Sequence, residues 1–227
     1  MRSFWRDLGA VLMIAGAVFL IDAGVTVAWQ DPMSGLIASF NQDNLSSNLD
    51  HLETVPLTSA QRQALHDLKT TGRRISFLAR LERRRVRAGQ ALGRIRIPRI
   101  GAKYVVVEGT SHDDLTKGPG HYPDTPLPGL RGTVAIAGHR TTYLAPFHDV
   151  DELKPGDPIT LDMPYGRFTY AVETTKIVAP TALYVKRPVG YDRLVLSACH
   201  PLYSAAQRII VFARLRSTVP LGRALVG

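Results

Sequence analysis

The first pattern along the chain is an apolar run from Leu8 to Trp29, LGAVLMIAGAVFLIDAGVTVAW, whose only charged residue is Asp22. A helix of this length would be long enough to cross a hydrocarbon core of roughly 30 Å. The apolar region of a cleaved signal peptide is shorter, and Trp29 is a residue type favoured at the membrane interface. The pattern therefore predicts a retained transmembrane helix over residues 8–29.

Two positive charges, Arg2 and Arg6, precede the apolar run. The positive-inside rule then predicts a short cytoplasmic N-terminus, residues 1–7. We therefore expect a protein that crosses the cell membrane once, with most of the chain on the extracellular side.

A polar, helix-prone segment follows the apolar run. Thr58 or Ser59 is placed to cap a helix. Apolar residues then recur at spacings compatible with one helical stripe that is interrupted at Gly72: Leu65, Leu68, Ile75, Leu78 and Leu81. The pattern predicts that residues 30–91 form a helical, arginine-rich stalk or linker.

From Leu92 the pattern changes to short runs rich in Val, Ile, Thr and Tyr, separated by Gly and Pro. The predicted strands are residues 93–97, 104–108, 132–137, 158–161, 167–175, 194–199 and 208–215. Regular short strands with turn signals between them are typical of an all-β sandwich or barrel. We expect this domain to span residues 92–217, with a C-terminal tail over residues 218–227.

Composition and charge narrow the class of function. The net charge is +9, and ten arginines lie between Arg73 and Arg99. Such a cluster is typical of a solvated helix face or of a surface that meets anionic lipid headgroups or a cell-wall polymer. Because the arginine cluster is expected on the extracellular side of the membrane, nucleic acid is not a favoured partner. With one cysteine and scattered histidines, the chain predicts neither a disulfide nor a metal site, and no cofactor is expected.

The single cysteine, Cys199, ends an apolar strand in the stretch LVLSACHP. A lone cysteine is often inert core filler, and reactivity requires an activating neighbour. If the strand pairs as a hairpin with the next one, Cys199 lies close to Arg208. A guanidinium beside a thiol favours the thiolate and donates hydrogen bonds to an oxyanion.

A nucleophilic cysteine also needs a proton carrier. His139 follows the apolar strand GTVAIAG and comes directly after Gly138, which leaves room for a substrate. His121 and His200 are competing candidates. His200 adjoins Cys199, and on a strand its side chain would point to the opposite face.

The residues quoted so far lie within longer blocks that resemble one family. Gly132 to Asp157 (GTVAIAGHRTTYLAPFHDVDELKPGD), Leu194 to Leu215 (LVLSACHPLYSAAQRIIVFARL) and Gly118 to Gly129 (GPGHYPDTPLPG) are similar to sortases, and most resemble class E sortases. The resemblance implies an all-β domain folded as a closed eight-stranded β-barrel, with an N-terminal membrane anchor. It also implies a catalytic triad of His139, Cys199 and Arg208.

The resemblance implies the reaction as well. Cys199 is expected to cleave a C-terminal sorting signal of a secreted protein between Thr and Gly, through a thioacyl intermediate. The protein would then pass to an amine of a peptidoglycan precursor, lipid II. Class E sortases prefer LAXTG-like signals over LPXTG, and they are not expected to need calcium.

Five further residues are expected in the substrate-binding groove by the same resemblance: Tyr122, Tyr143, His121, Ser197 and Ala198. The sequence departs from the family pattern before the nucleophile, where Ala198 replaces a Thr and removes a hydroxyl.

Two alternatives remain open. A pilin-polymerising sortase would use a Lys amine as the acceptor, and nothing in the chain excludes it. A catalytically idle barrel that only binds a sorting-like peptide has Ala198 as its support, while His139, Cys199 and Arg208 favour an enzyme.

Overall fold

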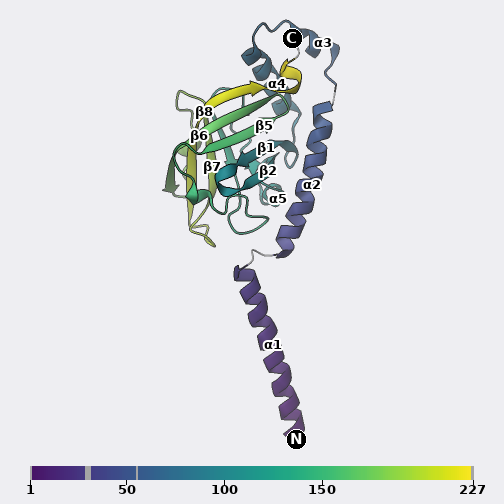
Figure 1. The fold of residues 1–227 in the computed structure, drawn as a ribbon, viewed down its shortest axis with the longest axis vertical. Helices are drawn as coiled ribbons and strands as arrows, with labels where there is room; N and C mark the ends of the chain where they lie inside the picture. The colour runs from purple at the N-terminus through teal and green to yellow at the C-terminus, as the bar shows by residue number, and fades with distance from the viewer. Residues whose placement is uncertain (1, 29–31, 55, 226–227) are drawn as a thin grey trace.

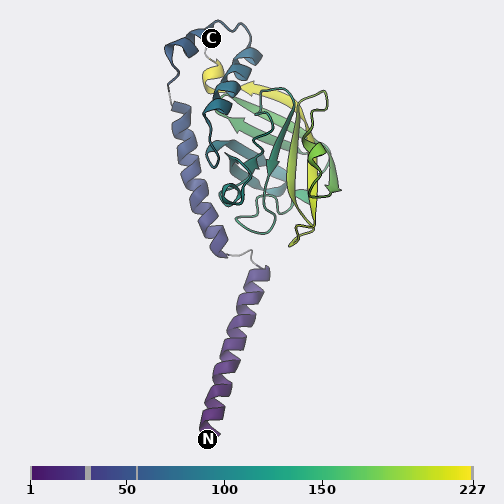
Figure 2. The same cartoon turned by 180° about the vertical axis from the view of Figure 1, so that it is seen from behind.

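The computed structural model describes residues 2–28, 32–54 and 56–225. Within these ranges helices come first, as α1 (Arg2–Ala28), α2 (Pro32–Thr54), α3 (Ser59–His66) and α4 (Thr71–Arg85). Figures 1 and 2 show α1 projecting away from the strands, α2 running along their side, and α3 and α4 at the far end.

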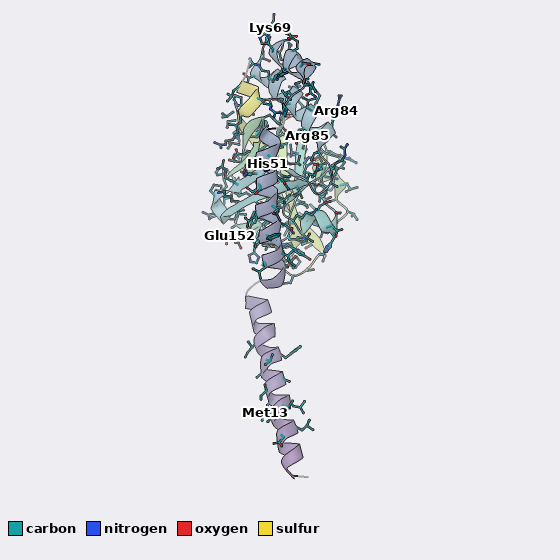
Figure 3. The ribbon with its side chains drawn as sticks, turned by 90° about the vertical axis from the view of Figure 1, so that its right-hand side faces the viewer. Met13, His51, Lys69, Arg84, Arg85 and Glu152 are labelled. Atoms are coloured by element: carbon teal, nitrogen blue, oxygen red, sulfur yellow. The ribbon has the colours of Figure 1, made fainter. Side chains whose placement is uncertain are left out.

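Helix α1 holds the apolar run together with Arg6, Asp7 and Asp22. Apolar side chains along its middle, including Met13 (labelled in Figure 3), are exposed. Among the described residues, no helix has the length and apolar character needed to cross a membrane. The predicted transmembrane helix over residues 8–29 is therefore not confirmed, and Trp29 lies outside the described residues.

The segment predicted as a stalk, residues 30–91, lies largely against the strands; residues 30, 31 and 55 are outside the described part. Leu45 and Leu49 of α2 are buried with apolar residues of the first two strands. Ile75 and Leu78 of α4 belong to the main hydrophobic core. Figure 3 shows α2, with His51 labelled, lying across the face of the strands.

The caps of α3 and α4 show why the predicted stripe is divided between two helices. Thr58 caps α3 through a capping box with Gln61, and Thr70 accepts a hydrogen bond from the backbone N–H of Arg73 at the start of α4. The break therefore falls before Thr70. Gly72, the predicted interruption, lies in the first turn of α4.

The strands close into an eight-stranded barrel, which confirms the predicted fold of this domain. They are β1 (Ala91–Ile97), β2 (Ala102–Glu108), β3 (Gly120–His121), β4 (Thr133–Ala137), β5 (Pro158–Met163), β6 (Gly166–Val178), β7 (Arg193–His200) and β8 (Gln207–Pro220). Their order around the barrel is β1-β2-β3-β4-β7-β8-β6-β5, with β4 parallel to β7. The chain as a whole is not all-β, because α1 to α4 fill most of its first third.

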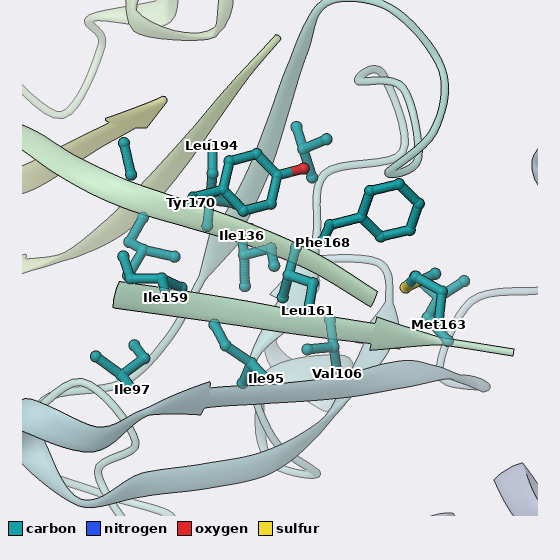
Figure 4. Close-up of a cluster of buried hydrophobic side chains, with 14 of the residues drawn as sticks. Ile95, Ile97, Val106, Ile136, Ile159, Leu161, Met163, Phe168, Tyr170 and Leu194 are labelled. Carbon is teal, nitrogen blue, oxygen red and sulfur yellow. The ribbon is translucent and has the colours of Figure 1, made fainter. Parts of the chain in front are cut away.

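Successive side chains along each strand point alternately into and out of the barrel, and the inward-pointing ones are apolar and fill it. Figure 4 shows Ile95, Ile136, Leu161, Tyr170 and Leu194 converging from different strands, each at most 2% exposed. Burial of one such side chain stabilises the fold by about 1.5–3 kcal/mol. Residues of the opposite parity on the same strands face outward, and the candidate chemistry lies on that outer face.

Candidate functional site

Cys199 and Arg208 are partners across the β7–β8 pair. The antiparallel register places Cys199 opposite Arg208 and Ser197 opposite Ile210. This confirms the predicted hairpin and brings a thiol and a guanidinium to neighbouring positions on adjacent strands. Cys199 is a free, half-buried thiol.

The strand alternation decides which face these residues occupy. Leu196 and Ala198 point into the barrel core, whereas Val195 and Ile210 belong to a second apolar cluster on the outer face. Because side chains alternate along a strand, Cys199 shares the outer face with Val195, and Arg208 shares it with Ile210.

His139 reaches the same face from β4. Ala137 of β4 is paired with Ser197 of β7, and the backbone N–H of Gly138 donates to Ser197 O at 3.0 Å. The parallel register therefore continues past the end of β4 and carries His139 alongside Cys199. At Gly138 a Cβ atom would lie 2.5 Å from the Phe147 ring, so this close approach requires glycine.

The imidazole of His139 lies in a largely desolvated place. Its Nε2 atom is buried, and within the described chain it has no hydrogen-bond partner. The ring of Tyr143 lies 5.3 Å from it, centroid to centroid. Burial lowers the pKa of His139 below its usual value of 6.5, and the nearby charge of His112 lowers it further. Both effects favour the neutral imidazole.

Arg208 has its guanidinium turned toward the loop between β7 and β8. Its Nη1 atom donates to the carbonyl oxygens of Ala205 and Gln207, both at 2.9 Å. A guanidinium carries five N–H donors in a fixed plane, so others remain for a ligand that enters beside Cys199. Since arginine does not lose its charge at working pH, this group acts electrostatically.

A small pocket of about 50 Å³ opens next to these residues. Its lining includes Tyr122, Lys186, Ser197 and Arg208, with apolar walls from the segment between β6 and β7. The Lys186 ammonium lies 4.5 Å from the centre of the Tyr122 ring and 2.7 Å from Asp124 Oδ2. Tyr122 and Ser197 thus lie where a substrate groove was predicted.

Two predicted groove residues are placed elsewhere. Ala198 is 3% exposed and faces the barrel core, because it alternates with Cys199 along β7. His121 is buried, with Nδ1 2.7 Å from Glu108 Oε2 and Nε2 3.0 Å from Thr125 Oγ1. Thr125 in turn donates to the carbonyl of Tyr122 at 2.8 Å, so His121 supports the loop that carries Tyr122.

Other residues near the site were missed from the sequence. His112, Lys186 and Asp124 lie on three separate segments between the strands and carry no motif of their own. Only the fold brings them to His139 and Tyr122.

In the described part of the chain, no group of three or more His, Cys, Asp or Glu residues could hold a metal ion. The acidic residues Asp114 and Asp151 have structural partners. Asp114 Oδ2 accepts from the backbone N–H and the hydroxyl of Ser111, the N-cap of the short helix α5 (His112–Leu115), and Asp151 pairs with Arg140 at 2.6 Å.

Comparisons with known proteins agree with this arrangement. A sortase domain family model matches residues 95–216. Sortase D of Bacillus subtilis (strain 168) is 38% identical over 130 residues, which cover 56% of this chain and 64% of that protein. Sortase SrtE1 of Streptomyces coelicolor is 29% identical over 143 residues, covering 56% of this chain and 41% of that one. The chain thus spans less than two thirds of the length of these curated relatives.

Solved structures extend the likeness to three dimensions. Sortase E from Streptomyces avermitilis is 38% identical, with a TM-score of 0.54 over 59% of this chain and 93% of that one. Sortase E1 from Streptomyces coelicolor, solved with a tripeptide in its active site, is 27% identical, with a TM-score of 0.56 over 60% of this chain and 93% of that one. Because the family model matches more than half of the chain and the barrel is of the same type, this chain belongs to the sortase family.

Proposed function

We propose that this protein is a cysteine transpeptidase that cleaves a C-terminal sorting signal and transfers the attached protein to an amine. The observation that carries the proposal is the juxtaposition on one outer face of the barrel: Cys199 opposite Arg208, with His139 alongside. The family membership indicates the reaction class. Cys199 provides the proposed nucleophile, His139 the proton carrier and Arg208 the hydrogen-bond donor to the oxyanion.

In the first half-reaction His139 takes the proton of the Cys199 thiol, and the thiolate attacks the carbonyl carbon of Thr in the signal. A C–S bond forms, the Thr–Gly C–N bond breaks, and His139 gives a proton to the departing amine of Gly. Arg208 donates hydrogen bonds to the carbonyl oxygen as negative charge develops on it. The product is a thioester between the secreted protein and Cys199.

In the second half-reaction an amine attacks the thioester. The C–N bond forms, the C–S bond breaks, and His139 takes the proton from the incoming amine and returns it to the Cys199 thiolate. The proposed acceptor is the amine of a peptidoglycan precursor, lipid II, as in the family. Transfer to a Lys amine of a pilin subunit would use the same steps and differs only in the acceptor.

The proposed signal is LAXTG-like or LPXTG. The pocket beside Arg208 supports a peptide groove there, since Tyr122 and Ser197 contribute to its lining. Assignment to class E is part of the proposal, supported by the likeness to sortase E structures and by the GHYP block that carries Tyr122.

The proposed place of action is the extracellular side of the cell membrane, where secreted proteins meet the peptidoglycan precursor. The exposed arginines of α4, among them Arg84 (Figure 3), offer a surface for anionic lipid headgroups or cell-wall polymer. Protease treatment of intact cells tests the location: an extracellular catalytic domain is cleaved without lysis, and a protected one contradicts the proposal.

The test of the activity uses the full chain, because α4 contributes to the barrel core. The protein is mixed with an LAXTG or an LPXTG peptide, with and without a glycine-type amine, and read by mass spectrometry. We expect an acyl adduct on Cys199 that passes to the amine and is absent from Cys199→Ala.

Arginine variants provide a matched comparison on β8. Arg208→Ala should lower the rate by about 10²–10³-fold, as for loss of an oxyanion donor. Arg216→Ala removes an exposed arginine of the same strand and should not. If folded protein forms neither adduct nor product with either peptide, the proposal fails, and a peptide-binding role takes its place.

A further inference from the structure

The loop that follows His139 has an unusual backbone. Tyr143, Leu144 and Ala145 adopt φ angles of 51°, 63° and 40°. Left-handed φ is uncommon for residues other than glycine, and here three such residues follow one another. A conformation of this kind persists only where the surrounding structure holds it, and it is concentrated at functional sites.

Part of what holds this loop is the barrel itself. The hydroxyl of Tyr104 donates to the carbonyl oxygen of Leu144 at 3.1 Å. The backbone N–H of Phe147 donates to the carbonyl oxygen of His139 at 3.0 Å, which closes the loop at its base. The first bond holds the middle of the left-handed stretch, and the second joins the residues on either side of it.

The rest of the support comes from helix α2. The backbone N–H of Tyr143 donates to the buried Ser34 Oγ at 3.2 Å, a contact between residues 109 positions apart. A methyl group on Gly35 would lie 4.0 Å from Leu144 Cδ2, so the Leu144 side chain packs on the first turn of the helix. The first turn of α2 therefore contacts the loop both by a hydrogen bond and by apolar packing.

Helix α2 is itself firmly placed on the barrel. Gln42 accepts from the backbone N–H of Val105 at 2.7 Å and donates to the carbonyl oxygens of Val105 and Lys117 at 3.1 and 2.6 Å. Nearer the end of the helix, Asp50 pairs with Arg94 at 2.8 Å. The position of Ser34 is thus set by contacts along the whole helix.

The loop places the ring of Tyr143 against His139, the candidate proton carrier. The ring lies 5.3 Å from His139, at an interplanar angle of 39°, and 6.1 Å from His112, edge to face. One aromatic ring therefore lies beside both histidines and packs on the imidazole of His139.

We propose that Tyr143 is a positioning residue that packs on the imidazole of His139, and that the first turn of α2 holds it there through Ser34. This inference rests on the proposed catalytic role of His139 and replaces direct substrate contact as the role of Tyr143. It also makes α2 part of the catalytic apparatus through its contact with the loop.

The consequence is electrostatic as well as geometric. Tyr143 on its own loop and His112 on α5 act on His139 directly, and the strand register brings Cys199 of β7 alongside it, with Arg208 of β8 opposite Cys199. Of these, Tyr143 is the apolar cover, and burial is the leading cause of the lowered pKa of His139. Loss of the ring admits water, which favours the charged imidazolium and raises this pKa.

The experiment follows the His139 titration by NMR in the full chain carrying Cys199→Ala, which removes coupling to the thiol. Tyr143→Ala should move the His139 pKa upward, whereas Tyr143→Phe keeps the ring and should titrate as the parent. Ser34→Ala should shift it in the same direction by a smaller amount. Ser47→Ala is the matched control, because Ser47 is an exposed serine of α2 whose hydroxyl donates to the carbonyl oxygen of Asp43 in the same helix.

Kinetics with the native Cys199 give the second readout. Tyr143→Ala should lower kcat by about 10²-fold, at the lower end of the range of about 10²–10⁴-fold for loss of acid–base catalysis, with little change in KM. Its pH profile should shift with the NMR titration. A rise in KM alone, with an unshifted His139 titration, assigns Tyr143 to substrate contact and overturns the proposal.

The two readouts separate this inference from the proposed function, because the titration needs no turnover. If no sorting peptide reacts, a shifted titration in Tyr143→Ala still supports the positioning role, and an unshifted one rejects it. Circular dichroism and thermal unfolding check each variant. If Tyr143→Ala does not fold, Ser34→Ala against Ser47→Ala decides the question.

Discussion

Gln42 attaches α2 to β2 by hydrogen bonds, and the effect of its loss on the free energy of unfolding can be worked out from the structure. β2 pairs with β1 along its length, but on its other edge β3 is only two residues long and begins at the level of Val107. The backbone of Val105 therefore lacks a strand neighbour on that edge. The Gln42 amide takes this place, accepting from its N–H and donating to its carbonyl.

The magnitude follows from the three hydrogen bonds of Gln42, each with a net value of about 1 kcal/mol. Their loss in Gln42→Ala should lower the free energy of unfolding by roughly 3 kcal/mol, since the Val105 amide stays partly buried without its partner. For a chain of this size, about 1 kcal/mol corresponds to roughly 2–4 °C in Tm. We therefore expect a fall of about 6–12 °C.

The assay is thermal and urea unfolding of the full chain, with Asn48→Ala as the control, because Asn48 is an exposed polar residue of the same helix. Gln42→Glu separates the components: it keeps an acceptor for the Val105 N–H and loses both donated bonds. If Gln42→Ala unfolds within about 0.5 kcal/mol of the parent, the size expected of ordinary surface substitutions, the view that Gln42 completes the edge of β2 is wrong.

Three further predictions concern the site itself. Gly138→Ala places a methyl group against the Phe147 ring and should destabilise the protein by about 1–3 kcal/mol, measured by urea unfolding. Lys186→Met breaks the ion pair with Asp124 and the contact of the ammonium with the Tyr122 ring, both beside the pocket. KM for the signal peptide should therefore change by a larger factor than the rate at which an alkylating reagent modifies Cys199. Because the pKa of His139 is lowered on folding, the unfolded chain binds more protons between that lowered value and about 6.5. The free energy of unfolding should therefore rise with pH through this window, by more in the parent than in His139→Gln.

Each of these has an outcome that contradicts it. Unchanged stability of Gly138→Ala means that the Phe147 ring moves aside freely. Equal kinetic constants for Lys186→Met and the parent mean that the pocket does not meet the peptide. If the free energy of unfolding changes with pH by the same amount in His139→Gln and in the parent, a group other than His139 causes the pH dependence.

The barrel could be predicted from the sequence because its signals are local. The alternating runs and the turns between them marked seven of the eight strands, and β3 was missed because two residues carry no periodicity. The Cys199–Arg208 contact was also within reach, since a short loop joins the two strands and antiparallel pairing leaves few registers. Ala198 was expected at the groove, although its position between outward-facing Ser197 and Cys199 already points it inward.

The sequence by itself determined the strand pattern and the pairing of Cys199 with Arg208, because each depends on residues close together in the chain. Only the tertiary structure decided that α2 lies on the barrel and that Tyr143 covers His139. The contacts responsible, from Ser34 to Tyr143 and from Gln42 to Val105, join residues 109 and 63 positions apart. A single polar side chain carries no local sign of so distant a partner, and its contribution appears only once the hydrophobic core has fixed where both segments lie.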